Sequence, residues 1–265
     1  MKLIINEHKE YIKQIFGLAK ADIVKTYKGA ALGWFWLVAK PLTKIFVYWF
    51  AIRIGLRGGR LIDGHPFFVW LIIGITPWFY ITEMLTQGTN SIRKYSYLVT
   101  KMKFPVSTVP TFVSLSKLII NMFLLGIAIV ILWLQGYHIS IYYLQLPYYL
   151  LMMFSFFTMW ALFAAPLAAV SRDFTNLVKS LITAIFWLSG ILYDPATIEI
   201  SWVRTMLLMN PVTYIVQGFR DTFIFNVWFF EKPFETITFL SLLLIMLFVS
   251  TNVFMKLRKD IPDVL

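Results

Sequence analysis

The residues that could perform acid–base, nucleophilic or metal chemistry are few in this chain of 265 residues. Cysteine is absent, which excludes disulfides, thiol catalysis and cysteine-ligated zinc or iron–sulfur sites. The three histidines, His8, His65 and His138, are too far apart in sequence to form a local metal motif. No Gly-x-x-x-x-Gly-Lys-Ser/Thr loop occurs, so we expect no nucleotide hydrolysis by this chain.

The acidic residues favour structural roles. Glu83 is the one acid inside the apolar spans described below, and its simplest interpretation is a pair with Arg93 or Lys94 at the membrane interface. A proton relay is the alternative, because intramembrane acids often carry protons. Lys117 has a similar simple interpretation, which is a side chain that reaches toward the interface.

The remaining candidate acids are spread along residues 194–233 and just beyond. Asp194 precedes a proline and Asp221 follows Arg220, so we expect capping and pairing. A cluster of carboxylates or histidines at one water face is absent. A membrane enzyme that acts on a polyprenyl-linked substrate is therefore disfavoured, although it stays open as the alternative from a different class. The acids concerned are Asp194, Glu199, Asp221, Glu231 and Glu235.

Composition places the chain in a membrane. Hydrophobic residues make up 59% of it and aromatic residues 18%, which is too apolar for an ordinary soluble domain. Six apolar segments are each near the length that crosses a hydrocarbon core of about 30 Å. We therefore predict an all-α membrane protein forming one domain over residues 1–265, with a six-span core over residues 32–255. The predicted spans are Leu32–Ile54, Phe67–Leu85, Pro110–Leu134, Pro147–Val170, Leu177–Tyr193 and Phe234–Met255.

The basic residues predict the orientation. If the N-terminus is inside, 17 of the 24 lysines and arginines fall on inner segments and six on outer ones. This bias favours two cytoplasmic termini, and it explains the net charge of +11 better than nucleic-acid binding does. No cleavable signal peptide is recognised at the N-terminus.

The N-terminal segment, residues 1–30, is predicted to be an amphipathic interface helix. Apolar residues recur at helical spacing through Leu3–Lys28, and lysines lie between them. A helix of this kind lies in the headgroup region with its lysines near anionic lipids. A soluble helix packed on a partner is the alternative.

Two further segments are expected to contact partners or close a pathway. Residues 88–105 carry four basic residues and no acid between two apolar spans, so we predict a cytoplasmic contact surface that contains a short helix. Residues 194–233 are too long for a turn and too apolar for a solvated loop. They predict two short re-entrant helices broken at Asn210-Pro211, because irregular backbone at membrane depth must be buried in protein or line a cavity.

Aromatic side chains are abundant near the span ends. About half of them suit the aromatic belts found at membrane interfaces. The others are candidates for a pathway that stacks weakly on sugar rings, so that a substrate can leave. The pathway candidates are Trp78, Phe186, Trp187 and Tyr193.

Several of these patterns together resemble the permeases of ABC exporters for cell-surface polysaccharides and teichoic acids. They are Tyr27-Lys28-Gly29 with Leu32-Gly33-x-x-Trp36 and Pro41, Gly74-x-x-x-Trp78, Asn90-Ser-Ile, Lys101-x-x-Phe104-Pro105 with Pro110, Ser171-Arg172-Asp173-Phe174, and Asn210-Pro211 with Arg220. The likeness covers nearly the whole chain. One departure is Gly190, where the family often has proline, and it leaves the kink of the fifth span open.

The resemblance implies a half-transporter of a bacterial plasma membrane that pairs with a second copy and with two copies of a separate ATPase. This chain would need no cofactor, and the ATPase would bind ATP and Mg²⁺. Residues 88–105 and 171–176 would be the cytoplasmic coupling loops, and residues 194–233 the outer gate. The coupling candidates are Arg93, Tyr95, Tyr97, Leu98, Val99, Phe104, Pro105, Arg172 and Asp173, and the gate candidates are Asn210, Pro211 and Arg220.

The family's cargo is a polymer linked to a polyprenyl diphosphate. Basic residues near the inner face would meet its headgroup, and the candidates are Lys28, Lys40, Lys44 and Arg93. Wall teichoic acid is the favoured polymer. An O-antigen or capsular polysaccharide is the near alternative, and a drug or small-lipid exporter of the same architecture is a further one.

Overall fold

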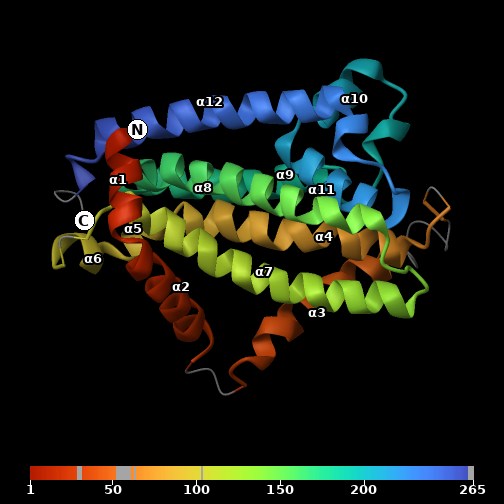
Figure 1. Ribbon diagram of the computed structural model, residues 1–265, viewed down its shortest axis with the longest axis horizontal. Coiled ribbons are helices and arrows are strands. Elements are labelled where there is room, and N and C mark those ends of the chain that lie inside the picture. The colour runs from red at the N-terminus through yellow and green to blue at the C-terminus, as the bar shows by residue number, and fades with distance from the viewer. Residues whose placement is uncertain (29–31, 52–60, 63, 103, 262–265) are drawn as a thin grey trace.

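Four long helices lie side by side along the length of the molecule in the computed structural model (Figure 1). They are α4 (Phe67–Glu83), α7 (Thr108–Leu134), α8 (Leu146–Val170) and α12 (Pro233–Leu257). The structure describes residues 1–28, 32–51, 61–62, 64–102 and 104–261. Within these residues every regular element is a helix, apart from one β-bridge between Ile62 and His65.

These four helices are long and apolar enough to cross a membrane. A π-helical turn, η2 (Met84–Gly88), extends α4, and a short 3₁₀ turn, η3 (Ile141–Gln145), leads into α8. The predicted second, third, fourth and sixth spans agree closely with these helices. Prolines at the start of α8 and α12 occupy positions that need no backbone N–H, which explains why the helices begin there.

Two predicted spans do not reach full length within the described residues. The helices α3 (Phe35–Phe50) and α9 (Arg172–Trp187) have 16 residues each, against about 20 needed to cross. The predicted end of the first span, residues 52–54, lies outside the described residues. Among the described residues four spans are supported, so the count of six remains a prediction.

The fifth span does not run to Tyr193. Helix α9 ends at Trp187, and Gly190 follows with a left-handed φ of +61°, which proline cannot adopt. A Cβ on Gly190 would lie 2.3 Å from the Cγ atom of Pro195. The chain therefore turns sharply here instead of continuing as a kinked helix.

The N-terminal segment forms two helices, α1 (Lys2–Glu10) and α2 (Ile12–Tyr27), which meet at Tyr11. They cross one end of the long helices, where both termini and the short helices α5 (Ser91–Lys94) and α6 (Ser96–Thr100) also lie (Figure 1). We call this end the terminal end. Residues 29–30 of the predicted interface segment are outside the described part.

The opposite end holds two short helices, α10 (Ser201–Leu208) and α11 (Pro211–Arg220), which are separated at Asn210-Pro211 (Figure 1). That they are re-entrant remains a prediction. Short turns flank them: η4 (Pro195–Thr197), η5 (Asp221–Phe225) and η6 (Phe229–Glu231). Helix α11 packs on α4, and both are buried over most of their length. Because α4 is covered on nearly every side, it forms the centre of the molecule.

Candidate substrate cavity

A cavity of about 770 Å³ lies between α2, α3, α4 and α7, toward the terminal end. The helices α2 and α3 form one wall, and residues of α4, η2 and α7 form the other. Five lysines line the cavity together with two acids, Asp22 and Glu83. The lysines are Lys25, Lys40, Lys44, Lys94 and Lys117. The excess of positive charge makes it suited to an anionic ligand.

Asp22 is the centre of a charged cluster in this cavity. Its Oδ1 atom lies 2.9 Å from Lys94 Nζ, and its Oδ2 atom lies 3.4 Å from Lys117 Nζ. Ser116 donates a hydrogen bond of 2.5 Å to Oδ2, and the hydroxyl of Tyr95 donates to Oδ1. One carboxylate thus connects α2 with α7 and with residues 88–105, the segment predicted to couple to an ATPase and called the coupling segment below.

These contacts set the charge state of Asp22. Burial of the side chain raises the pKa, but the charge of Lys117 and hydrogen bonds from Ser116, Tyr95 and Lys94 outweigh it. The resulting pKa of Asp22 is about 2, against an ordinary value of 3.8. Burial and the neighbouring carboxylate raise the pKa of Tyr95. Asp22 is therefore an anion at neutral pH, and Tyr95 remains a hydrogen-bond donor.

A second groove of about 430 Å³ shares residues with the cavity and runs between α3, α4 and α9. Lys44, Phe79 and Thr82 belong to both, so the two spaces adjoin. Tyr48, Trp78, Phe186 and Trp187 supply aromatic walls to the groove. A cavity lined by lysines thus adjoins a groove lined by aromatic rings.

Two of the four predicted headgroup residues line the cavity and two do not. Lys40 and Lys44 line the cavity, and their amines lie 5.7 and 5.9 Å from the ring centroids of Trp36 and Phe79. Lys28, which follows α2, is exposed and does not line the cavity; it lines another groove that shares Lys25 with the cavity. Arg93 donates a hydrogen bond to the carbonyl of Ala169, 3.0 Å away, and does not line the cavity.

Three predicted pathway aromatics, Trp78, Phe186 and Trp187, line the aromatic groove. Trp78 and Phe186 pack together with ring centroids 5.4 Å apart. Tyr193 lies beyond the end of α9, and its hydroxyl donates to the carbonyl of Trp187. It supports the end of the helix and is not among the groove residues.

The coupling prediction needs a correction. Tyr95 and Leu98 are each 3% exposed and pack, together with Val99, on Phe112 and other residues of α7. They face into the chain because the segment forms two short helices that pack against α2, α7 and α8. Tyr97 is 42% exposed, so among Tyr95, Tyr97, Leu98 and Val99 it is the residue that a partner can reach.

The other coupling candidates lie at the terminal end. Phe104 packs edge-on against Tyr11, and the carbonyl of Pro105 accepts hydrogen bonds from the first turn of α7. Arg172 and Asp173 are exposed. They belong to the first turn of α9, so the predicted loop 171–176 is helical from residue 172 onward. Lys103 lies outside the described residues.

The gate candidates fix α11 at both ends. Asn210 caps the helix by accepting from the Val212 amide at 2.9 Å, and its own amide donates to the carbonyl of Leu188. Pro211 occupies the first helical position. Arg220 is fully buried and donates to the carbonyls of Gly190 and Ile191 at 2.7 and 2.6 Å.

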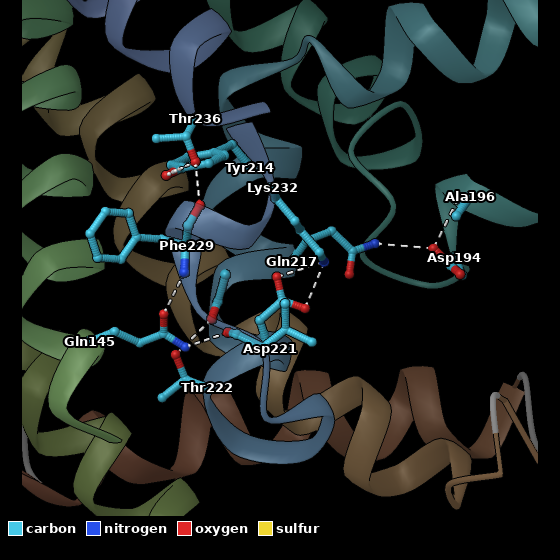
Figure 2. A network of polar contacts seen from close by, with 12 residues as sticks. Gln145, Asp194, Ala196, Tyr214, Gln217, Asp221, Thr222, Phe229, Lys232 and Thr236 are labelled. Carbon is cyan, nitrogen blue, oxygen red and sulfur yellow. Dashed lines mark hydrogen bonds and ion pairs between the residues drawn. The ribbon is translucent and has the colours of Figure 1, made fainter. Parts of the chain in front are cut away.

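The predicted pairs of the acids are partly wrong. Glu83 has no ion pair among the described residues, and Lys94 pairs with Asp22 instead. Asp221 pairs with Lys232 at 2.7 Å, because the adjacent Arg220 is turned toward carbonyl groups. Figure 2 shows this pair beside Asp194, which accepts from the Ala196 amide and so has the capping role that we predicted.

Further polar contacts hold the segment after α11. The Gln145 side chain donates to the carbonyl of Val227 and accepts from the amide of Phe229, and Thr236 donates to the carbonyl of Phe229 (Figure 2). These contacts satisfy backbone groups of an irregular segment, which would be costly to bury without hydrogen-bond partners.

Sequence reasoning missed Asp22. Its spacing carried a signal, because Ile15, Ala19 and Asp22 fall on one helical face at i, i+4 and i+7. All three are buried in the structure. An acid on the apolar face of a lysine-rich helix requires a buried cationic partner.

Known proteins resemble this chain in sequence over most of its length. The sequence model of ABC-2 type transporters matches residues 13–224. The chain belongs to the ABC-2 type transporter family. It is thus a multi-pass membrane subunit of a kind that works with a partner ATPase.

The relatives extend this likeness over the chain. The O-antigen export system permease protein RfbA of Myxococcus xanthus is 22% identical over 261 residues, which cover 98% of each chain. Two proteins of the same name from Klebsiella pneumoniae are each 23% identical. These two alignments cover 94% of this chain and 93% of the relatives.

Proposed function

We propose that this chain is the transmembrane subunit of an ATP-driven exporter that moves a polyprenyl-diphosphate-linked surface polysaccharide to the outer leaflet of the plasma membrane. The names of the relatives support a polysaccharide of the O-antigen class over wall teichoic acid, the polymer first favoured. In this proposal both termini and the terminal end are cytoplasmic.

The observation that carries the proposal is the lysine-lined cavity that adjoins an aromatic groove. A diphosphate headgroup carries several negative charges, and lysine amines bind phosphate as point charges. The groove offers ring faces to sugars without a tight set of hydrogen bonds, which suits a substrate that must move on. The lysine-lined cavity would therefore meet the diphosphate of a lipid-linked glycan, and the adjoining aromatic groove would meet the sugars that are attached to it.

The proposed assembly contains two copies of this chain and two copies of the ATPase. The ATPase would bind ATP and Mg²⁺, and its docking surface would be the exposed part of the terminal end. Tyr97, Arg172 and Asp173 lie on that part. Residues 88–105 also contact the end of α8, since Arg93 donates to the carbonyl of Ala169. In this proposal a movement of the docked ATPase reaches α8 through that contact.

Deletion of the gene in its native strain tests the proposal. The expected result is a loss of surface polysaccharide and an accumulation of the lipid-linked glycan inside the cell. The wild-type gene should restore the surface polysaccharide and remove the accumulated glycan, but not when the ATPase partner cannot hydrolyse ATP. Chemical analysis of the accumulated polymer identifies the cargo, since polyol-phosphate repeats would mark a teichoic acid. Normal surface polymers in the deletion strain would refute the proposal.

A further inference from the structure

Asp22 lies between two lysines of the cavity. Its two oxygens contact Lys94 and Lys117 at 2.9 and 3.4 Å, and all three residues line the cavity. The carboxylate belongs to α2, whereas the lysines belong to α5 and α7. An acid of the chain itself thus stands where the proposed function would draw a phosphate group.

Lys117 needs an anion at this place. Its side chain is 5% exposed, and its ion pair with Asp22 is the only one it forms among the described residues. A buried ammonium group without a partner costs several kcal/mol. Withdrawal of Asp22 is therefore unfavourable unless another anion replaces it, and the open side of the cavity is where such an anion could arrive.

Asp22 also reaches the coupling segment. Tyr95 and Lys94, which donate to its Oδ1 atom, lie at the junction of α5 and α6. Ser116, which donates to Oδ2, is adjacent to Lys117. A change at the carboxylate would accordingly alter contacts of the helices that lie at the docking surface.

We propose that Lys94 and Lys117 form an anion site that Asp22 fills in this structure and that the diphosphate of a polyprenyl lipid takes over by displacing Asp22. This inference rests on the proposed function. The carboxylate of Asp22 competes with the ligand. The apparent affinity for the ligand therefore equals the intrinsic affinity multiplied by the fraction of molecules in which the two lysines are free. Displacement frees Tyr95 from its acceptor and so reports an occupied cavity to the coupling segment.

The test is a binding titration of the full chain in lipid nanodiscs. Polyprenyl diphosphate is the probe, unphosphorylated polyprenol shows binding of the lipid tail alone, and inorganic pyrophosphate shows binding of the headgroup alone. Asp22→Asn should raise the affinity for polyprenyl diphosphate about tenfold if the lysines are free in about one molecule in ten. Lys117→Met should lower the affinity. Glu7→Gln, which breaks an ion pair with Arg258 away from the cavity, should leave it unchanged.

The double variant Asp22→Asn/Lys117→Met separates competition from a structural role. Under the proposal Lys117→Met still weakens binding when Asn replaces Asp22, and Asp22→Asn alone is a gain of affinity that damage to the fold cannot produce. Equal or weaker binding by Asp22→Asn, with normal binding by wild type, overturns the exchange and leaves the proposed function standing. Equal binding of polyprenol and polyprenyl diphosphate by wild type overturns both.

Discussion

Gly74 allows the buried guanidinium of Arg220 to approach α4, and its replacement by alanine should destabilise the protein. A Cβ at this position would lie 2.4 Å from Arg220 Nη2 and 3.3 Å from the carbonyl oxygen of Ile191. Relief of the overlap needs a shift of roughly 1 Å. The hydrogen bonds of 2.7 and 2.6 Å to Gly190 and Ile191 cannot survive such a shift. The ring of Trp70, 3.7 Å from the guanidinium carbon, limits movement on that side.

The expected cost follows from these two bonds. Hydrogen bonds to charged groups contribute about 1.5–3 kcal/mol each, so Gly74→Ala should cost roughly 3–6 kcal/mol. In a protein of this size, the midpoint of thermal unfolding in detergent should fall by about 6–24 °C.

Gly126→Ala is the matched control for this prediction. Gly126 also lies in a long apolar helix, and a Cβ there meets no atom within 4 Å. Its replacement should be neutral or stabilising by up to about 1 kcal/mol. Equal melting temperatures for Gly74→Ala and Gly126→Ala would refute the assignment of Arg220 as a rigid attachment between α11 and the end of α9.

Three further predictions concern other contacts. Gly218→Ala should be at least as destabilising, because a Cβ would lie 2.0 Å from Tyr149 Cε1, and Tyr149→Leu in the same chain should restore part of the loss in a thermal melt. The folded-state pKa of Asp22 is lowered to about 2, so the ionised carboxylate stabilises the folded protein by about 2 kcal/mol. This contribution to the free energy of unfolding is complete above pH 3.8 and is lost as the pH falls toward 2. In acid unfolding, Asp22→Asn should lack this loss of stability between pH 3.8 and 2. Tyr97→Glu should reduce export in a surface-polymer assay while immunoblots show a normal protein level, because Tyr97 is exposed. Leu98→Glu should instead lower the amount of folded protein on immunoblots, because it buries a charge. A loss of protein in Tyr97→Glu together with a normal level in Leu98→Glu would contradict the coupling geometry.

Long apolar runs predicted the structure well. The boundaries of α7, α8 and α12 lie within two residues of the expected spans, because about 20 apolar residues with flanking prolines leave few alternatives. The break at Asn210-Pro211 was likewise predictable, since an asparagine cap followed by proline is a local signal for a helix start.

Side-chain direction was not predictable in the same way. Whether Tyr95 or Tyr97 faces the interior depends on how α5 and α6 rotate against α2 and α7, which is decided by packing between distant segments. The partners of Lys94 and Asp221 were mistaken for the same reason, since sequence neighbours compete with residues far along the chain. Of the four pathway aromatics, Trp78, Phe186 and Trp187 line one groove and Tyr193 does not, and their role in a pathway remains a prediction.

Reconstituted transfer of a lipid-linked glycan tests the central claim most directly. Vesicles containing the chain and its partner ATPase would be supplied with glycan extracted from the deletion strain, and its arrival at the opposite leaflet measured with and without ATP. The account predicts ATP-dependent transfer that falls at least about tenfold in Lys40→Gln/Lys44→Gln, whose two charges line the cavity. Transfer should persist in Lys20→Gln/Lys28→Gln, which removes the same charge outside it. No ATP-dependent transfer by wild type, or equal rates in the two double variants, would contradict the account.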